Sequence, residues 1–111
     1  MAGYVPIEIE AYASFSRIIV LSNEDGTRQN LVGSYANSSI RETQFSSTNY
    51  VLTAQITGAN IGEVTLSMTA ANTGLIPPGR YLYDVVETDD LGERSRLIEG
   101  IVVVNPGITQ F

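Results

Sequence analysis

The segment that decides the fold is GRYLYDVVETDDLGERSRLIEGIVVV, which occupies residues 79–104. Its two ends, Arg80 to Thr88 and Glu93 to Val104, are rich in β-branched and aromatic residues, which favour strands. The intervening Asp89-Asp90-Leu91-Gly92 has the Asp and Gly that tight reversals need. The segment therefore predicts two strands joined by a hairpin loop.

Four residues of this hairpin have a predicted structural role. Gly79 lets the backbone reverse after two prolines, and Gly100 inside a strand indicates a bulge or a close approach of another backbone. Tyr81 and Tyr83 project from the same face of their strand, and each hydroxyl can bond a backbone group at the rim of the sheet. These residues are interpreted as a structural motif and not as a ligand site.

Asp84 belongs to the same motif but faces the opposite side. A cross-strand ion pair with Arg94 or Arg96 is expected if the hairpin register brings the side chains together. The six arginines are spread along the chain and are outnumbered by carboxylates, so the sequence predicts no basic patch. Their planar guanidinium groups suit pairing with carboxylates across subunit contacts.

Outside the hairpin, alternation of apolar and polar residues dominates and helical spacing is nearly absent. The apolar run at 18–21 predicts burial on both faces of its strand. Strands about ten residues apart predict an all-β fold: one immunoglobulin-like antiparallel β-sandwich of about seven strands. The expected elements are strands at 7–21, 35–43, 50–56 and 64–68, and a short helical turn within 69–76.

The composition argues against an enzyme. The 111 residues have a formal charge of −6 and include no His, Cys, Lys or Trp. Without these residues the chain lacks a Ser-His-Asp triad, a Cys nucleophile, a Schiff-base Lys and the usual zinc ligands. We therefore expect no catalytic residue, no metal and no cofactor. The acidic balance also argues against nucleic acid and anionic membranes as partners.

Three sites of chemistry remain as weaker alternatives. Glu8 and Glu10 lie on one strand face, roughly 7 Å apart, a spacing that suits a glycosidase carboxylate pair, but charge on an exposed strand edge is the commoner reason. The acidic loop around Asp89 and Asp90 offers oxygen ligands to calcium but lacks the spacing of a calcium loop. The six tyrosines offer stacking surfaces for sugars, although tyrosine also simply favours strands.

The two ends of the chain are candidates for contacts with other proteins. Residues 1–14 form an N-terminal strand or extended arm, residues 15–107 the β-sandwich domain and residues 108–111 a short C-terminal tail. The arm either closes its own sheet or adds a strand to a neighbour. The N-terminus has neither the basic nor the apolar region of a signal peptide. The candidate interaction residues are Tyr4, Ile7, Ile9, Phe15, Ile108 and Phe111.

The C-terminal half of the chain resembles a small β-sandwich module of tailed-bacteriophage structural proteins. The resemblance rests on Leu75-Ile76-Pro77-Pro78-Gly79-Arg80-Tyr81-Leu82-Tyr83-Asp84-Val85, followed by Leu97-Ile98-Glu99-Gly100 and by valines ending at Thr109. Upstream, Asn30-Leu31-Val32-Gly33 and residues 62–68 are also similar to the module, so the likeness spans about Phe15 to Thr109.

This resemblance implies a non-enzymatic virion component, assembled in the cytoplasm of the host bacterium. A single domain best suits a capsid decoration (cement) protein that contacts the major capsid protein and forms a homo-oligomer, with a trimer at local threefold positions as one arrangement. One alternative is a tail, neck or baseplate component of the same particle. A second alternative is a carbohydrate-binding or adhesive sandwich module.

Overall fold

The computed structural model describes residues 3–23, 25–43 and 49–106. Strands dominate, with one short 3-10 helix (η1) and one helical turn (α1). The elements in chain order are β1 (Gly3–Tyr4), β2 (Ile7–Glu10), β3 (Phe15–Val20), β4 (Tyr35–Arg41), β5 (Asn49–Gly58), η1 (Ala59–Ile61), β6 (Glu63–Met68), α1 (Ala70–Thr73), β7 (Gly79–Thr88) and β8 (Arg94–Asn105). The prediction of an all-β fold is confirmed.

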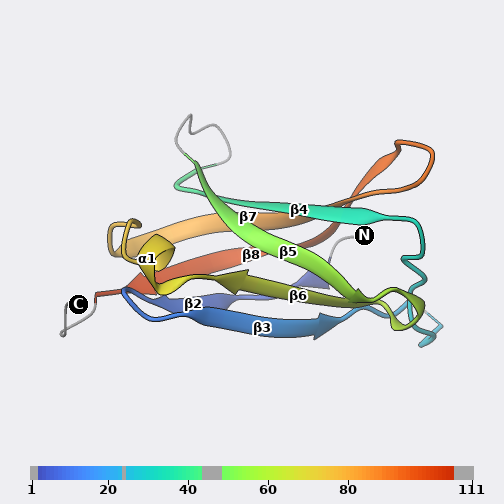
Figure 1. The fold of residues 1–111 in the computed structure, drawn as a ribbon, viewed down its shortest axis with the longest axis horizontal. Helices are drawn as coiled ribbons and strands as arrows, with labels where there is room; N and C mark the ends of the chain where they lie inside the picture. Colours follow the sequence, from blue (N-terminus) through green and yellow to red (C-terminus); the bar gives the residue numbers. More distant parts are fainter. Residues whose placement is uncertain (1–2, 24, 44–48, 107–111) are drawn as a thin grey trace.

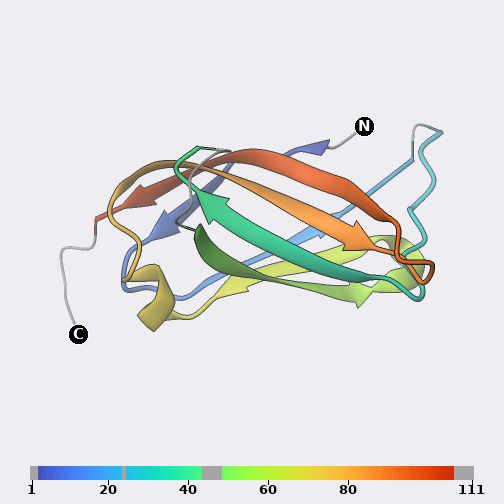
Figure 2. The same ribbon diagram turned by 90° about the horizontal axis from the view of Figure 1, so that it is seen from above.

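The strands form one hydrogen-bonded sheet that curls over on itself. The order is β1-β8-β7-β4-β5-β6-β3, with β2 also paired to β8. The long strand β5 makes the corner, because its first residues pair with β4 and the residues from Thr53 onward pair with β6. As a result β4, β7 and β8 lie over β3, β5 and β6 as two layers (Figures 1 and 2).

The hydrophobic core fills the space between the two layers. The longer strands contribute alternate residues, since successive side chains point to opposite faces of a strand. In β6 the pattern is regular, with Val64, Leu66 and Met68 buried and the residues between them partly exposed. The other fully covered side chains include Ile9, Ile40, Leu52, Val85, Ile98, Val102 and Val104.

The N-terminal residues close the sheet along β8. Gly3 and Tyr4 pair with Ile98 and Glu99, and Ile7 to Glu10 pair with Val102 to Asn105, both in parallel. This parallel edge departs from the all-antiparallel arrangement predicted above. The arm therefore completes its own sheet in this structure. Alternation does not show whether β2 pairs in parallel or antiparallel, because both kinds of partner leave the same face of β2 buried.

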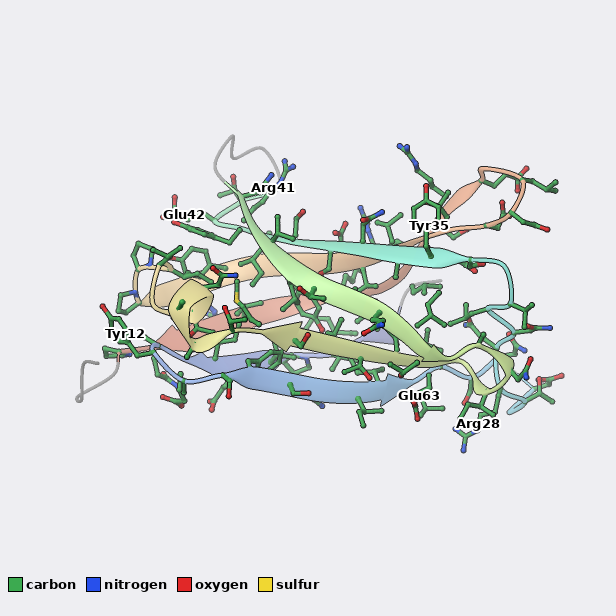
Figure 3. The ribbon with its side chains drawn as sticks, in the orientation of Figure 1. Tyr12, Arg28, Tyr35, Arg41, Glu42 and Glu63 are labelled. Carbon is green, nitrogen blue, oxygen red and sulfur yellow. The ribbon has the colours of Figure 1, made fainter. Side chains whose placement is uncertain are left out.

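The expected single strand over residues 7–21 is wrong, because a turn divides it. Tyr12 has a φ of 66°, and the N–H of Ala13 bonds the carbonyl of Glu10 at 3.1 Å. The helical turn α1 packs on this corner, where the Thr73 hydroxyl donates to the carbonyl of Ala13 at 2.9 Å. Figure 3 shows Tyr12 beside α1. The turn moves the chain from β2 in one layer to β3 in the other.

The apolar run at 18–21 is also not buried on both faces, contrary to the prediction. Ile19 and Leu21 are buried, but Ile18 is 62% exposed and Val20 40% exposed. The reason is that β3 turns Ile18 and Val20 away from the core, whereas Ile19 faces it. Its outward side chains have no second layer of the described chain to cover them.

The C-terminal hairpin matches the prediction closely. β7 and β8 pair in antiparallel register from Gly79 opposite Val104 to Thr88 opposite Arg94, with an irregularity between Val85 and Val86. The predicted close approach at Gly100 is confirmed, because a side-chain carbon there would overlap the carbonyl oxygen of Val5. Gly79 has a φ of 153°, consistent with its predicted role in the reversal.

Candidate functional site

The side of β1, β2, β8, β7 and β4 that points away from the core forms a broad surface, which we call the outer face. Strand register places its side chains in cross-strand rows, roughly 7 Å apart along the strands. The rows are Tyr4, Glu99, Asp84 and Ser39; then Ile101, Leu82 and Arg41; then Glu8, Val103 and Arg80. Figure 3 shows Arg41 projecting from β4 away from the other layer.

An apolar stripe runs across the middle of the outer face. Leu82 lies directly opposite Ile101, and Val103 follows Ile101 on the same side of β8. Leu82 is 43% exposed, and Ile101 and Val103 are half-buried, although no other element covers them in the described chain. Tyr4, 62% exposed, extends the apolar surface at the edge of the sheet.

Two adjoining hollows lie along this stripe, and both are lined by Tyr4 and Ile101. The first has a volume of about 400 Å³ and is also lined by Leu82, Asp84 and Arg96. The second has a volume of about 590 Å³ and extends past Pro6 and Phe15 to the open edge between the layers. Both are open to solvent, so together they form a shallow surface suited to a broad contact.

Arginines gather around these hollows. Arg41 and Arg96 line the first, and Arg17 and Arg80 line the second. The carboxylates in the two linings are those of Asp84, Glu99 and Glu8, so the hollows have a net charge of +1 in a chain whose total is −6. The fold brings together four arginines that are distant along the chain, but the three carboxylates among them leave this face close to neutral, so the expectation of no basic patch stands.

Two of the carboxylates are paired within the face. The Arg96 Nε lies 3.2 Å from the Asp84 Oδ2, and the Arg96 Nη1 lies 3.5 Å from the Glu99 Oε2. This confirms Arg96, and not Arg94, as the predicted partner of Asp84. Because all three side chains are substantially exposed, the pairs contribute little to stability and mainly fix the shape of the surface.

The tyrosines of β7 share one face, as predicted, and the structure shows that this face is the core side. The Tyr81 hydroxyl donates to the carbonyl of Pro77, and the Tyr83 hydroxyl donates to the carbonyl of Val5, each at 2.5 Å. Tyr83 is only 4% exposed, and burial, opposed in part by the nearby Arg17 guanidinium, raises the pKa of its hydroxyl to about 12. Tyr83 thus ties the N-terminal strand to the sheet from inside.

Replacement of Tyr83 by phenylalanine tests this tie. The change leaves the carbonyl of Val5 without its side-chain donor, so we expect the free energy of unfolding to fall by about 1 to 2 kcal/mol at neutral pH. The measurement is urea unfolding followed by circular dichroism. Val51→Phe introduces a phenylalanine at an exposed position of β5 and serves as the control. It should change the free energy of unfolding by less than about 0.5 kcal/mol.

The raised pKa of Tyr83 predicts how the free energy of unfolding changes at high pH. An unfolded tyrosine has a pKa near 10, whereas folded Tyr83 holds its proton up to about 12. Its stabilising effect is therefore present below pH 10 and is lost between pH 10 and 12, by about 1.4 kcal/mol per unit. In Tyr83→Phe the free energy of unfolding should fall less steeply with pH over this range. An unchanged slope would contradict the raised pKa of Tyr83.

The predicted contact residues differ in how exposed they are. Tyr4 is exposed on the outer face, and Phe15 is half-buried at the rim of the second hollow. Ile7 and Ile9 are 3% and 0% exposed, so their expected role as contact residues is wrong in this arrangement. They are on the core side of β2, where pairing with β8 buries them. The remaining two predicted residues, Ile108 and Phe111, lie outside the described residues.

The acidic alternatives have other roles in the structure. The Glu10 Oε1 accepts from the Asn105 Nδ2 at 3.0 Å, which links β2 to β8. The Asp89 Oδ1 accepts from the backbone N–H of Leu91 and of Glu93, each at 2.9 Å, as a turn cap does. Across the described ranges, no three His, Cys, Asp or Glu side chains lie where they could hold a metal ion.

Sequence reasoning missed Leu82, Ile101, Arg80 and Arg41. The signal was present, because the alternation that predicts Tyr81 and Tyr83 on one face requires Arg80 and Leu82 on the other. What alternation could not supply was the strand order, which places β4, β7, β8 and the N-terminal strand side by side. No helix in the described part of the chain is long and apolar enough to cross a bilayer.

Comparison with known proteins shows a likeness of fold only. No family model and no curated protein matches the chain. A mutant of the SrpA adhesin from Streptococcus sanguinis superposes with a TM-score of 0.51 and 14% identity, over 92% of this chain and 55% of that one. The internalin-like protein lmo2027 of Listeria monocytogenes gives a TM-score of 0.51 and 17% identity, over 94% and 29%. The chain thus spans little more than half of the first and less than a third of the second.

Proposed function

We propose that this chain is a non-catalytic structural module that acts by contact through its outer face. The observation that supports the proposal best is the exposed apolar stripe of Leu82, Ile101 and Val103, bordered by arginines. A lone exposed apolar residue is ordinary, but a contiguous stripe with a polar rim is typical of an interaction surface. The sequence resemblance suggests the setting: a bacteriophage virion, with the chain as a capsid decoration protein.

The shape of the outer face favours contact over chemistry. Its hollows are open, and the two carboxylates of the first, those of Asp84 and Glu99, are already paired with Arg96. Catalytic sites instead use enclosed pockets with groups of perturbed pKa. A shallow surface with a modest binding energy suits a component that is repeated many times in a lattice, because many weak contacts add up by multivalency.

The experiment compares virion or capsid binding of two aspartate variants. Leu82→Asp introduces a charge into the apolar stripe, whereas Ile18→Asp introduces the same charge on β3 in the other layer, at a position that is also exposed. We expect Leu82→Asp to reduce the occupancy of undecorated capsids by at least about tenfold and Ile18→Asp to retain it. Circular dichroism verifies that both variants fold. Equal occupancy by the two variants would refute the role of the outer face.

The copy number of the chain in purified virions tests the setting. A decoration protein is expected in numbers near those of the major capsid protein, whereas a tail, neck or baseplate component is expected in far fewer copies. Quantitative gel staining of purified particles distinguishes these cases. Absence of the chain from particles would contradict a virion role altogether.

A second candidate is an adhesive module that binds carbohydrate. It is favoured by the exposed ring of Tyr4 beside the polar groups of Asp84 and Arg96 in the first hollow, since sugars stack on aromatic rings and bond to such groups. The two solved structures of similar fold are an adhesin and an internalin-like protein. Binding on a glycan array that is lost in Tyr4→Ala would support this candidate.

A further inference from the structure

The end of the β7–β8 hairpin is apolar and negatively charged. Leu91, at its tip, is 83% exposed, the highest value among the large hydrophobic residues described. It stands in a five-residue loop with three carboxylates, those of Asp89, Asp90 and Glu93, and no basic residue before Arg94. The tip is thus an apolar side chain surrounded by negative charge.

Hydrogen bonds hold this tip in one shape. The Asp89 carboxylate accepts from the N–H of Leu91 and of Glu93, while the backbone N–H of Asp89 donates to the carbonyl of Glu93 at 2.9 Å. The N–H of Gly92 donates to the carbonyl of Asp89 at 3.0 Å. Because these bonds use Asp89, its side chain supports the loop, and the loop backbone that carries Leu91 has little conformational freedom left to lose on binding.

Neighbouring residues widen the apolar end. A side-chain carbon at Gly33 would lie 3.5 Å from the Cβ of Asp90, so the turn that contains Val32 is next to the hairpin tip. Val32 is 61% exposed, and Tyr35, which pairs with Thr88 at the base of the hairpin, is 57% exposed. Figure 3 shows Tyr35 close to the hairpin. We call Val32, Tyr35, Asp90, Leu91 and Glu93 the hairpin end.

The hairpin end and the outer face are complementary. One presents an exposed leucine with three carboxylates around it, and the other presents an apolar stripe whose two hollows are lined by four arginines and by the carboxylates of Glu8, Asp84 and Glu99, a balance of +1. Opposite charges at the rim of a contact fix orientation and exclude like-charged partners. The hollow of about 400 Å³ has ample room for a leucine side chain.

We propose that the hairpin end of one copy of this chain docks on the outer face of a second copy. The proposal deepens the contact function proposed above by naming the neighbour. Such a contact is head-to-tail, since it joins two different surfaces, and each docked copy still offers a free hairpin end and a free outer face. Contacts of this type build closed rings or open filaments. One loop buries little area, so each contact is weak and repetition strengthens it.

Two variants test the contact with purified protein. Leu91→Asp removes the apolar tip but keeps the outer face, and Leu82→Asp alters the outer face but keeps the tip. Sedimentation velocity measures the mass of the wild type and of each variant from low concentration up to about 1 mM. At that concentration even a contact with a millimolar Kd joins a large fraction of the molecules. The wild-type mass should increase with concentration, and salt should weaken association because screening shortens the reach of the charges.

The two variants behave differently alone and together if the contact is head-to-tail. Each alone should associate at least about tenfold more weakly than the wild type. Mixed, they should form a 1:1 complex that grows no further, because one supplies the working face and the other the working tip. Ile18→Asp should associate like the wild type.

Three results would overturn the proposal: a wild type that stays monomeric at about 1 mM, self-association by either variant alone as strong as that of the wild type, or a mixture that associates no more than the separate variants. Self-association of Leu91→Asp alone, in which the outer face is intact, would indicate instead a symmetric contact of outer face with outer face. Failure here leaves the proposed function testable by itself, because loss of capsid occupancy in Leu82→Asp, with no self-association of the wild type, would assign the outer face to another protein.

Discussion

Replacement of Gly100 by alanine is expected to lower the free energy of unfolding by about 3 kcal/mol. The added methyl group would overlap the carbonyl oxygen of Val5, which is backbone and cannot rotate aside. Relief requires β1 to move away from β8, and this movement also breaks the hydrogen bond from Tyr83 to Val5 and the pairing of Gly3 and Tyr4 with β8. Urea unfolding measures the loss of stability.

Hydrogen exchange locates the effect of Gly100→Ala. In the native protein the Val5 N–H bonds the carbonyl of Glu99 at 3.0 Å, so its exchange should accelerate strongly in the variant. Gly3→Ala is the matched control, since its added carbon would lie at an ordinary 3.7 Å from the carbonyl of Leu97. Equal stability of the two variants would mean that the close approach at Gly100 does not hold the N-terminal strand.

The hairpin of β7 and β8 was predictable because its determinants are local. The Asp and Gly residues of the loop select a reversal, and the strands on both sides alternate without interruption. A hairpin also fixes its own register, so the faces of Tyr83, Asp84 and Gly100 followed from the sequence. The predicted ion pair of Asp84 could be narrowed to Arg96 only with the irregularity between Val85 and Val86, which shifts the register by one residue on β8.

The arrangement of the N-terminal half depends on contacts between distant residues, which alternation does not encode. Residues 7–21 alternate almost throughout, yet a residue with positive φ at Tyr12 sends the two halves to different layers. A tyrosine is not a typical signal for that conformation, since Gly and Asn adopt it more readily. In β3 the side chain of Ile18 then points away from the core, where no further layer of the described chain covers it.

The candidate site was predictable only in part for the same reason. Tyr4 was identified from its position in an arm, and Asp84 from the hairpin. The gathering of Arg17, Arg41 and Arg80 requires the strand order β1-β8-β7-β4 and the crossing of β3 to the other layer. Charges spread evenly along a chain thus give no information on how they are distributed over a folded surface.

Replacement of Ile9 by alanine distinguishes a core residue from a contact residue. Ile9 is fully covered between the layers, so removing three carbons leaves a cavity, and we expect the free energy of unfolding to fall by about 3 kcal/mol. If Ile9 instead reached out to a neighbour, as its position in a terminal arm suggested, stability would be unchanged and binding would weaken. Chemical unfolding and capsid binding measured on the same preparation separate these outcomes.

Ile18→Ala is the matched control, because the chemical change is identical and the sequence predicted the opposite environments. Ile18 was expected to be buried on both faces and Ile9 to be a contact residue, whereas the structure exposes the first by 62% and buries the second. Ile18→Ala should therefore change stability by less than about 0.5 kcal/mol. If Ile18→Ala were the more destabilising of the two, the outward face of β3 would have to be covered, and the assignment of Ile18 to the solvent side would be wrong.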